Sequence, residues 1–499
     1  MSEAGGTGEE AGVAVEQESG ARPGLRQLGL RGAFWMAIGQ GGSQGFRLAG
    51  NLVLTRPGFL DPLSFGLMLI VKALMGAFEA FSDIGIAASI VQHPDGEAPR
   101  FRDTAWTFQV LRGLLLYAVL YLAARPIAAF YDAPALEDLL PIAGLGLVLA
   151  GLASPALQLR KRRLDMRSLA WIDLCAEGVA FVVMVVHALV SPTVWSLVYG
   201  FVAGIATRTL LSHLCFPDCR PRLGLERTAA LAILGFGAWI VLNTPLGFLA
   251  DQLDRLALGK LFEGQKELLG VYQIAIVFGG IPYLVLVKLG AGIAFPAFSK
   301  AKNEGRDLGR VFDGVRLPIY TIGGLALAGI IATGGQVVTV LYDARWHDAG
   351  WMVALVALGQ WFRVASIPAA NYLFALGEPK WLVVANAAKI LGYLAFVPLG
   401  YVSWGLVGAL GGFALGEAAG FASYAVALRL RGIRDLWPEL GLLLLLLATG
   451  GLGRLLADLL AGAGWHPVAG FALCAPAVLL AWAPVLRRAL LHLRGRAPA

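Results

Sequence analysis

Ionisable side chains interrupt the long apolar segments of this chain, and their positions indicate where chemistry takes place. In a segment that crosses a membrane, a charge at the helix centre costs at least about 2.5–3.5 kcal/mol. Such groups persist when they face a wet cavity, pair with each other or reach an interface. The predicted cationic site residues are Arg47, Lys72, Arg112, Arg208, Lys288, Arg363 and Lys389, and the residues predicted for ion coupling or pairing are Glu79, Asp83, Asp173, Glu177, Asp251, Asp254, Arg255 and Glu417.

The cations are distributed over both halves of the chain, which favours one shared, electropositive cavity. Such a cavity suits an anion such as phosphate or pyrophosphate, because an arginine side chain offers bidentate donors. The carboxylates would neutralise the cations in the empty state, or carry a coupling proton or Na⁺. For each single residue a structural pair or an interface anchor is the alternative, and Asp-Gln-Leu-Asp-Arg (251–255) can form an internal ion-pair knot.

The composition requires a membrane environment for these residues. Of the 499 residues 58% are hydrophobic and only 15% are charged, and 64 glycines come in addition. Soluble chains carry about 25% charged residues. The mean hydropathy of +0.70 excludes a disordered chain, a basic nucleic-acid-binding domain and a series of soluble domains. We predict an all-α polytopic membrane protein, whose net charge of +7 reflects Lys and Arg on cytoplasmic loops.

A helix needs about 20 mostly apolar residues to cross the hydrocarbon core. This length predicts about 14 spans. Most Lys and Arg fall on alternate loops, which places both termini in the cytoplasm. The predicted spans lie near 30–54, 63–90, 104–124, 136–157, 168–190, 192–214, 229–256, 269–295, 317–340, 350–374, 381–400, 403–428, 438–460 and 466–486.

An internal repeat divides the predicted helices into two halves. Phe-Tyr-Asp-Ala (130–133) recurs as Leu-Tyr-Asp-Ala (341–344), and the stretch around Pro155 recurs around Pro368. Ser-Phe-Gly-Leu-Met-Leu-Ile (64–70) matches 268–274 at nearly the same offset. Both halves start inside, so the repeat is parallel, and its interface is the expected substrate site. The predicted units are a disordered cytosolic tail (1–28), two six-helix lobes (29–215 and 229–430), two additional helices (436–490) and a second tail (491–499).

Motifs for catalysis or metal binding are not found in the sequence. Gly-Leu-Gly-Leu-Val-Leu-Ala-Gly (144–151) lies inside a span without a preceding strand, so helix packing explains its glycines better than a nucleotide loop. Four scattered cysteines are too few for a disulfide framework. His213, Cys215 and Cys219 resemble half of a metal site that lacks a second ligand pair. We expect no metal, no cofactor and no enzyme activity.

Several short motifs occur in a characteristic order: Phe-Gly-Leu-Met (65–68), Phe-Ser-Asp-Ile-Gly-Ile-Ala-Ala-Ser-Ile-Val (81–91), Arg-Lys-Arg-Arg-Leu-Asp-Met-Arg (160–167), Asp-Arg-Leu-Ala-Leu-Gly followed by Leu-Gly-Val-Tyr (254–272), and Phe-Pro-Ala-Phe-Ser (295–299). Over about residues 30–430 the chain resembles the bacterial polysaccharide transporters. These are the lipid-linked oligosaccharide flippases of the multidrug/oligosaccharidyl-lipid/polysaccharide exporter superfamily. Asp83, Asp254 and Arg255 match positions where that family usually keeps charge, whereas the short 257–268 connection departs from its pattern.

The resemblance implies a two-lobed cavity that opens alternately inward and outward. It would move an undecaprenyl-pyrophosphate-linked glycan to the periplasmic leaflet for O-antigen, capsule or exopolysaccharide synthesis. The expected partners are membrane lipids and a polysaccharide polymerase or export machinery. A multidrug or cation antiporter of the same superfamily is one alternative, and it would be expected to keep an acidic cavity. A peptidoglycan-precursor flippase is another. A membrane glycan polymerase or ligase would need catalytic groups outside the bilayer, where only His347 and His466 lie.

Overall fold

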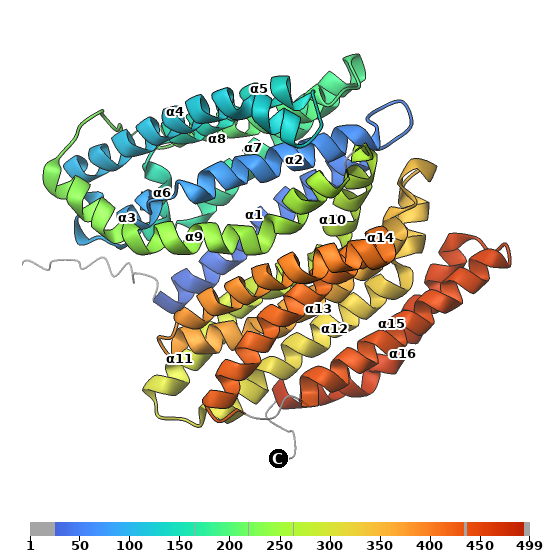
Figure 1. Cartoon of the computed structure of the whole chain (residues 1–499). Helices are drawn as coiled ribbons and strands as arrows, with labels where there is room; N and C mark the ends of the chain where they lie inside the picture. Colours follow the sequence, from blue (N-terminus) through green and yellow to red (C-terminus); the bar gives the residue numbers. More distant parts are fainter. Residues whose placement is uncertain (1–24, 164, 218, 263, 434–436, 494–499) are drawn as a thin grey trace, which may run out of the picture.

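The computed structural model describes residues 25–163, 165–217, 219–262, 264–433 and 437–493. Within these ranges the chain consists of helices that run roughly along one axis, with no strands (Figure 1). The first half contains α1 (Leu25–Leu54), α2 (Pro62–Phe81), α3 (Ile86–Gln92), α4 (Pro99–Phe130), α5 (Leu136–Leu152), α6 (Ala156–Arg162), α7 (Met166–Val190) and α8 (Trp195–Leu214). The second contains α9 (Arg227–Leu261), α10 (Lys266–Leu289), α11 (Phe295–Asn303), α12 (Leu308–Leu341), α13 (Ala349–Ala375), α14 (Lys380–Leu430), α15 (Trp437–Gly462) and α16 (Pro467–Leu493).

The predicted all-α polytopic class is confirmed. Ten of the described helices are long and apolar enough to cross a membrane, and the bent pair α5–α6 raises the number to eleven. The 51-residue α14 holds two of the predicted spans, because Trp404 and Gly405 leave helical geometry in its middle. The count of fourteen stays a prediction. The predicted tails 1–28 and 491–499 lie mostly outside the described residues, and helix already covers 25–28 and 491–493.

Two predicted spans are shorter than expected because local polar bonds end their helices. In the span predicted near 63–90, α2 stops at Phe81, where the Ser82 hydroxyl donates to the carbonyl oxygen of Phe78 at 2.6 Å. Asp83 then accepts from the amide of Gly85, whose φ of +71° starts α3 in a new direction. The span predicted near 136–157 also breaks, since α5 and α6 meet at a bend of 59°.

The element order repeats. Tyr131 follows the end of α4 and Tyr342 follows the end of α12, as the two Tyr-Asp-Ala motifs predict. At one end of the molecule, α2 crosses α10 at Gly66 and Gly270, which are equivalent positions in the predicted repeat. A Cβ on Gly66 would overlap the carbonyl oxygen of Lys266, four residues before Gly270, and a Cβ on Gly270 would overlap that of Pro62, four residues before Gly66. This reciprocity is what a two-fold relation between the helices requires.

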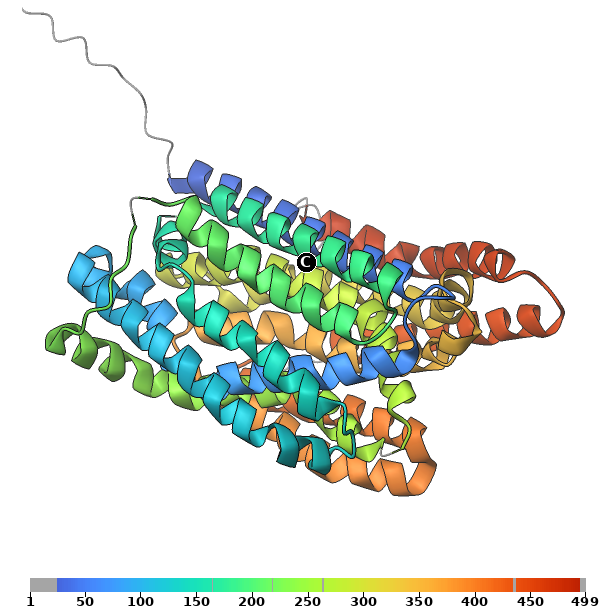
Figure 2. The ribbon, with the colours of Figure 1, turned by 90° about the horizontal axis from the view of Figure 1, so that it is seen from above.

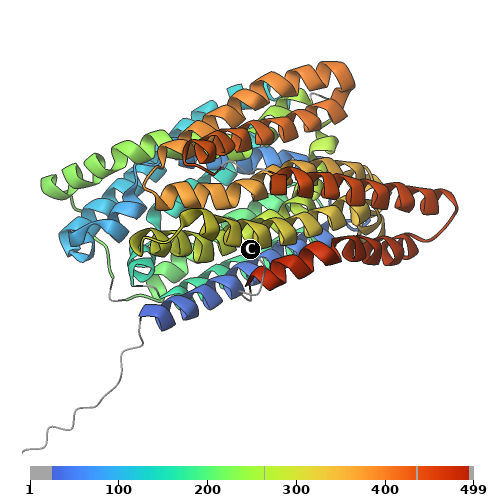
Figure 3. The ribbon, with the colours of Figure 1, turned by 90° about the horizontal axis from the view of Figure 1, so that it is seen from below.

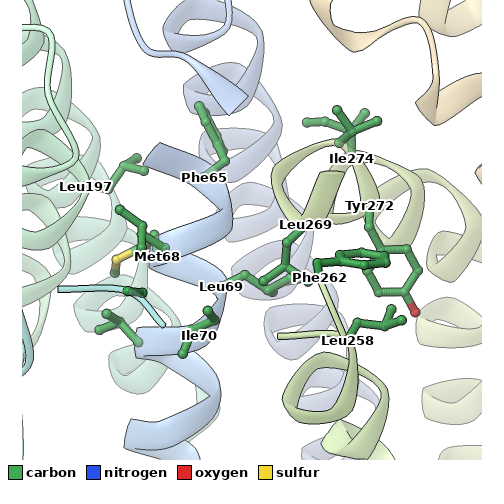
Figure 4. Close-up of a cluster of buried hydrophobic side chains, with 14 of the residues drawn as sticks. Phe65, Met68, Leu69, Ile70, Leu197, Leu258, Phe262, Leu269, Tyr272 and Ile274 are labelled. Carbon is green, nitrogen blue, oxygen red and sulfur yellow. The ribbon is translucent and has the colours of Figure 1, made fainter. Parts of the chain in front are cut away.

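The largest apolar core lies where the two halves meet. Figure 4 shows Leu69 of α2 facing Leu269 and Phe262 from the second half, while Met68 of the same helix points to the other side, toward Leu197 of α8. Around α2 lie α5 and α8 from the first half and α9 and α10 from the second. Figure 2 shows the same helices from above. The centre of the molecule is therefore built from both halves.

The C-terminal pair α15–α16 covers the outer side of α12 and lies nearest the viewer in Figure 3. Trp482 packs beside Gly324 and donates from its indole nitrogen to the Thr449 hydroxyl at 3.0 Å. The equivalent helix of the first half, α4, instead leaves Leu115 and Leu122 exposed, as expected of a lipid-facing surface. The pair makes the molecule asymmetric.

Candidate functional site

Four charged side chains from α9, α13 and α14 form one compact group, the C-terminal ion cluster (Asp251, Arg363, Lys389 and Glu417). The Lys389 ammonium lies 2.7 Å from Glu417 and 3.6 Å from Asp251, while Arg363 donates to Asp251 at 2.5 Å. Lys389 and Glu417 are buried. Two cations and two carboxylates make the cluster neutral, which is how charges persist away from water.

The possible knot within 251–255 takes its close partners from other helices, although Arg255 is an electrostatic neighbour of Asp251. Asp251 pairs with residues of other helices, and Asp254 accepts a hydrogen bond from the Tyr272 hydroxyl at 2.8 Å through Oδ2. The reason is geometric: Asp251, Asp254 and Arg255 project from one end of α9 towards α10, α13 and α14, which supply the partners.

A pocket adjoins the C-terminal ion cluster, and it holds about 530 Å³ of empty space, part of which is open to solvent. Its polar wall combines acceptors and donors, and its apolar wall is formed by α10, α13 and α14. The Phe413 ring packs edge-on against Tyr393 at 5.1 Å, and Tyr393 donates to Glu417 at 2.7 Å. The polar lining consists of Asp251, Asp254, Arg255, Tyr272, Gln360, Arg363, Tyr393 and Glu417.

A second group, the central cationic group, consists of Arg47 on α1, Lys72 on α2, Arg255 on α9 and Lys288 on α10. Arg47, Glu177 and Arg255 are electrostatic neighbours of Lys72, and Arg47 is a neighbour of Lys288. Glu177 is ion-paired with Arg47. Within the described residues neither lysine forms an ion pair. Arg255 also has Asp251 as an electrostatic neighbour, so the four cations outnumber the carboxylates near them and this region is electropositive.

Lys72 is an exposed residue on a helix that is otherwise mostly enclosed. The most apolar 18 residues of α2 are 61% buried, the largest share among the candidate spans. Both chain neighbours of Lys72, Val71 and Ala73, are buried. The Lys72 side chain itself is exposed. A water-filled space between the two halves would account for an exposed ammonium on so enclosed a helix.

The remaining predicted residues lie in the first half, in positions that hold helices together. Arg112 donates to the Ser82 hydroxyl at 2.9 Å and to the Glu79 carbonyl oxygen at 2.6 Å, so it caps the end of α2. Arg208 pairs with Asp173 at 3.0 Å and links α8 to α7. Glu79 is an exposed electrostatic neighbour of Arg112, Arg208 and Asp83, and Asp83 shapes the break after α2.

The basic motif 160–163 is explained by the fold. Arg162 spans the carbonyl end of α3, where its Nη1 donates to Ile90 at 3.2 Å and to Val91 at 3.3 Å. Arg163 donates twice to Glu97, and these hydrogen bonds hold the pKa of that carboxyl below its usual range. His213 also has a structural contact, since its Nε2 lies 2.9 Å from the Leu152 carbonyl oxygen.

Sequence reasoning missed the uncharged polar residues of the pocket. Gln360 and Tyr272 lie in apolar segments and carry no charge, so hydropathy treats them as ordinary span residues. Tyr283 was also missed, although Arg363 lies 4.3 Å above its ring. The available signal was a glutamine three residues before an intramembrane arginine, one helical turn apart.

Comparison with known proteins places this arrangement in a family. The model of the polysaccharide biosynthesis protein family matches residues 53–350, more than half of the chain. This chain belongs to that family. The membership confirms the resemblance expected from the motifs between residues 65 and 299. In this polysaccharide biosynthesis protein, the matched region contains the whole central group except Arg47.

Two relatives of this chain are named for the biosynthesis or transport of polysaccharides. It is 24% identical to lipopolysaccharide biosynthesis protein WzxC of Escherichia coli over 78% of this chain and 79% of the relative. It is 22% identical to succinoglycan biosynthesis transport protein ExoT of Rhizobium meliloti over 73% and 74%. The fold matches the lipid II flippase MurJ in an inward closed conformation, with a TM-score of 0.72 and 11% identity over 90% of this chain and 97% of the other. An inward-facing MATE-family transporter matches with a TM-score of 0.64 and 12% identity, over 79% and 96%.

Proposed function

We propose that this protein moves a lipid-linked oligosaccharide, carried on undecaprenyl pyrophosphate, from the cytoplasmic to the periplasmic leaflet of the bacterial inner membrane. The glycan would serve O-antigen, capsule or exopolysaccharide synthesis. Family membership, the relatives named for lipopolysaccharide and succinoglycan, and the MurJ-like fold support this function. The observation that carries it is the central cationic group, which both halves build.

The physical task is to bring a charged, hydrated head group through hydrocarbon. A charge that loses its water without a substitute pays a large desolvation cost. Arg47, Lys72 and Lys288 supply fixed positive charge and N–H donors at the place where water is removed, and pyrophosphate oxygens accept such bonds. The apolar prenyl tail can stay in the surrounding lipid throughout.

We propose that residues 29–215 and 229–430 act as two lobes that open the central space alternately to each side, with 436–490 attached to the second lobe. The tight crossing of Gly66 and Gly270 supports a closed contact at one end of the interface.

We assign Lys72, Lys288 and Arg47 to the pyrophosphate, and Arg112 and Arg208 to holding α2, α7 and α8 in place. Coupling to a proton or Na⁺ through the exposed carboxylates Glu79 and Asp251 is part of the proposal.

Exchange of Lys72 for methionine tests the proposal. Lys72→Met keeps the length of the side chain and removes the charge, so we expect glycan export to fall about tenfold, because a hydrogen bond to a charged group contributes about 1.5–3 kcal/mol. Export is measured by complementation of a deletion strain and by translocation in proteoliposomes. Lys300→Met is the matched control, since Lys300 is exposed on α11 and among the described residues forms an ion pair only with Glu304.

Unchanged export in Lys72→Met and Lys288→Met, with normal expression, would contradict the proposal. An antiporter for cationic drugs would behave differently, because removal of positive charge from its cavity would raise rather than lower the efflux of cationic dyes. Dye efflux measured in the same strains therefore separates the two functions.

A further inference from the structure

The pocket beside the C-terminal ion cluster contains two oxygens that lack donors. Asp254 Oδ1 and Gln360 Oε1 are shielded from solvent, and within the described residues neither has a hydrogen-bond partner. A buried acceptor left unpaired is costly and calls for an explanation. Both residues line the same pocket, so one bound group with donors can satisfy both.

We propose that this pocket holds the sugar next to the pyrophosphate of the lipid-linked glycan, an inference that rests on the proposed function. Sugar hydroxyls donate and accept, as the pocket requires: Asp254 Oδ1 and Gln360 Oε1 accept, while Arg255 donates. The rings of Tyr393 and Phe413 offer apolar surface to the C–H face of a sugar.

The position of Arg255 connects the sugar pocket to the pyrophosphate. Arg255 lines the pocket and is an electrostatic neighbour of Lys72 in the central cationic group. The first sugar is bonded directly to the pyrophosphate, so a head group held at Lys72 has its sugar beside Arg255. Gln360 on α13 and Asp254 on α9, both in the second half of the chain, would then accept hydrogen bonds from the sugar.

A metal cation fits the same two oxygens less well. Hard cations such as Ca²⁺ take six to eight oxygen ligands. The pocket also presents Arg255 and Arg363, whose positive charges repel a cation at short range. A neutral ligand rich in hydroxyls does not need six to eight oxygen ligands and is not repelled by the two arginines.

Binding to the purified full-length protein tests the subsite. One probe is the lipid-linked glycan pool extracted from source cells that lack this protein, and the other is undecaprenyl pyrophosphate that carries no glycan. We expect the glycan probe to bind the wild type about tenfold more tightly than the bare pyrophosphate, as one or two added hydrogen bonds allow. Gln360→Leu should remove most of this difference and change the affinity for the bare pyrophosphate less than twofold.

The chain offers a matched control. Gln336 Oε1 on α12 is also buried and unpaired within the described residues, but Gln336 does not line the pocket. Gln336→Leu should leave the affinities for both probes unchanged. Asp254→Asn, which keeps the shape of the carboxyl, should weaken the glycan probe selectively, and melting temperatures of all variants confirm that they are folded.

The outcomes separate the two proposals. Equal binding of both probes to the wild type, or equal losses for both in Gln360→Leu, overturns the sugar subsite and leaves the flippase function standing. A change in the pH or Na⁺ dependence of export by Asp254→Asn, without selective loss of the glycan probe, assigns the oxygens to a coupling ion and also overturns it. Failure of the wild type to bind either probe overturns the proposed function itself.

Discussion

Gly66→Val is expected to lower glycan export by about 5- to 150-fold. A Cβ at this position overlaps the carbonyl oxygen of Lys266, which is backbone and cannot rotate away. The two branches of valine therefore force α2 and α10 apart at their crossing. Overpacking in a well-packed core costs about 1–3 kcal/mol, and here the whole cost falls on the state in which this end is closed. Alternation between two states needs both to be populated, so a shift of this size slows transport.

Gly270→Val should have the same effect, because its Cβ overlaps the Pro62 carbonyl oxygen in the reciprocal arrangement. Gly329→Val on α12 is the control, since a Cβ there meets no atom within 4 Å. Export in the deletion strain and the amount of protein in the membrane are measured for all three. Wild-type export by Gly66→Val at normal abundance would show that the crossing does not have to close during transport.

The repeat made this crossing predictable in part. Aligning 64–70 with 268–274 places Gly66 opposite Gly270, and a parallel two-fold relation brings equivalent positions together at the axis. The sequence does not reveal which equivalent pair lies on the axis. Phe65 and Leu269 are just as apolar as their neighbours, and only packing decides that the glycines meet there.

Charge was a good guide to the site and a poor guide to its geometry. An intramembrane lysine or arginine is costly enough to mark a functional or paired position, and Lys72, Arg363 and Lys389 all lie in such positions. Whether a cation is open to a ligand or neutralised depends on residues more than a hundred positions away, as the pair of Arg363 with Asp251 shows. Sequence spacing within one helix contains no such information.

Helix ends were harder to predict than helix cores. Hydropathy runs smoothly through Ser82 and Asp83 because the apolar residues on both sides dominate any window of 20 residues. The break is caused by local hydrogen bonds from a serine hydroxyl and to an aspartate, which compete with the helix backbone. Positive φ at Gly85 completes the turn.

One ion pair outside the site is expected to dominate stability. Arg316 on α12 and Glu439 on α15 are both almost fully buried, and Nη1 lies 3.1 Å from Oε1. Arg316 also reaches Asp313 at 2.8 Å. This contact ties the C-terminal pair α15–α16 to the second half of the molecule, at the opposite end of α12 from the bond of Arg454 to the Gly350 carbonyl oxygen.

Arg316→Met should lower the free energy of unfolding by about 3–5 kcal/mol, because it leaves the Glu439 carboxylate buried without its partner. Thermal unfolding of the purified protein measures the change. Arg310→Met on the same helix removes an exposed arginine that pairs with Asp307 at 3.4 Å, and it should cost less than about 1 kcal/mol. The double variant Arg316→Met with Glu439→Leu should recover most of the loss, since no charge then remains buried. A loss in Arg316→Met as small as in Arg310→Met would show that water reaches Glu439, and that apolar packing around Trp482 alone holds α15–α16 in place.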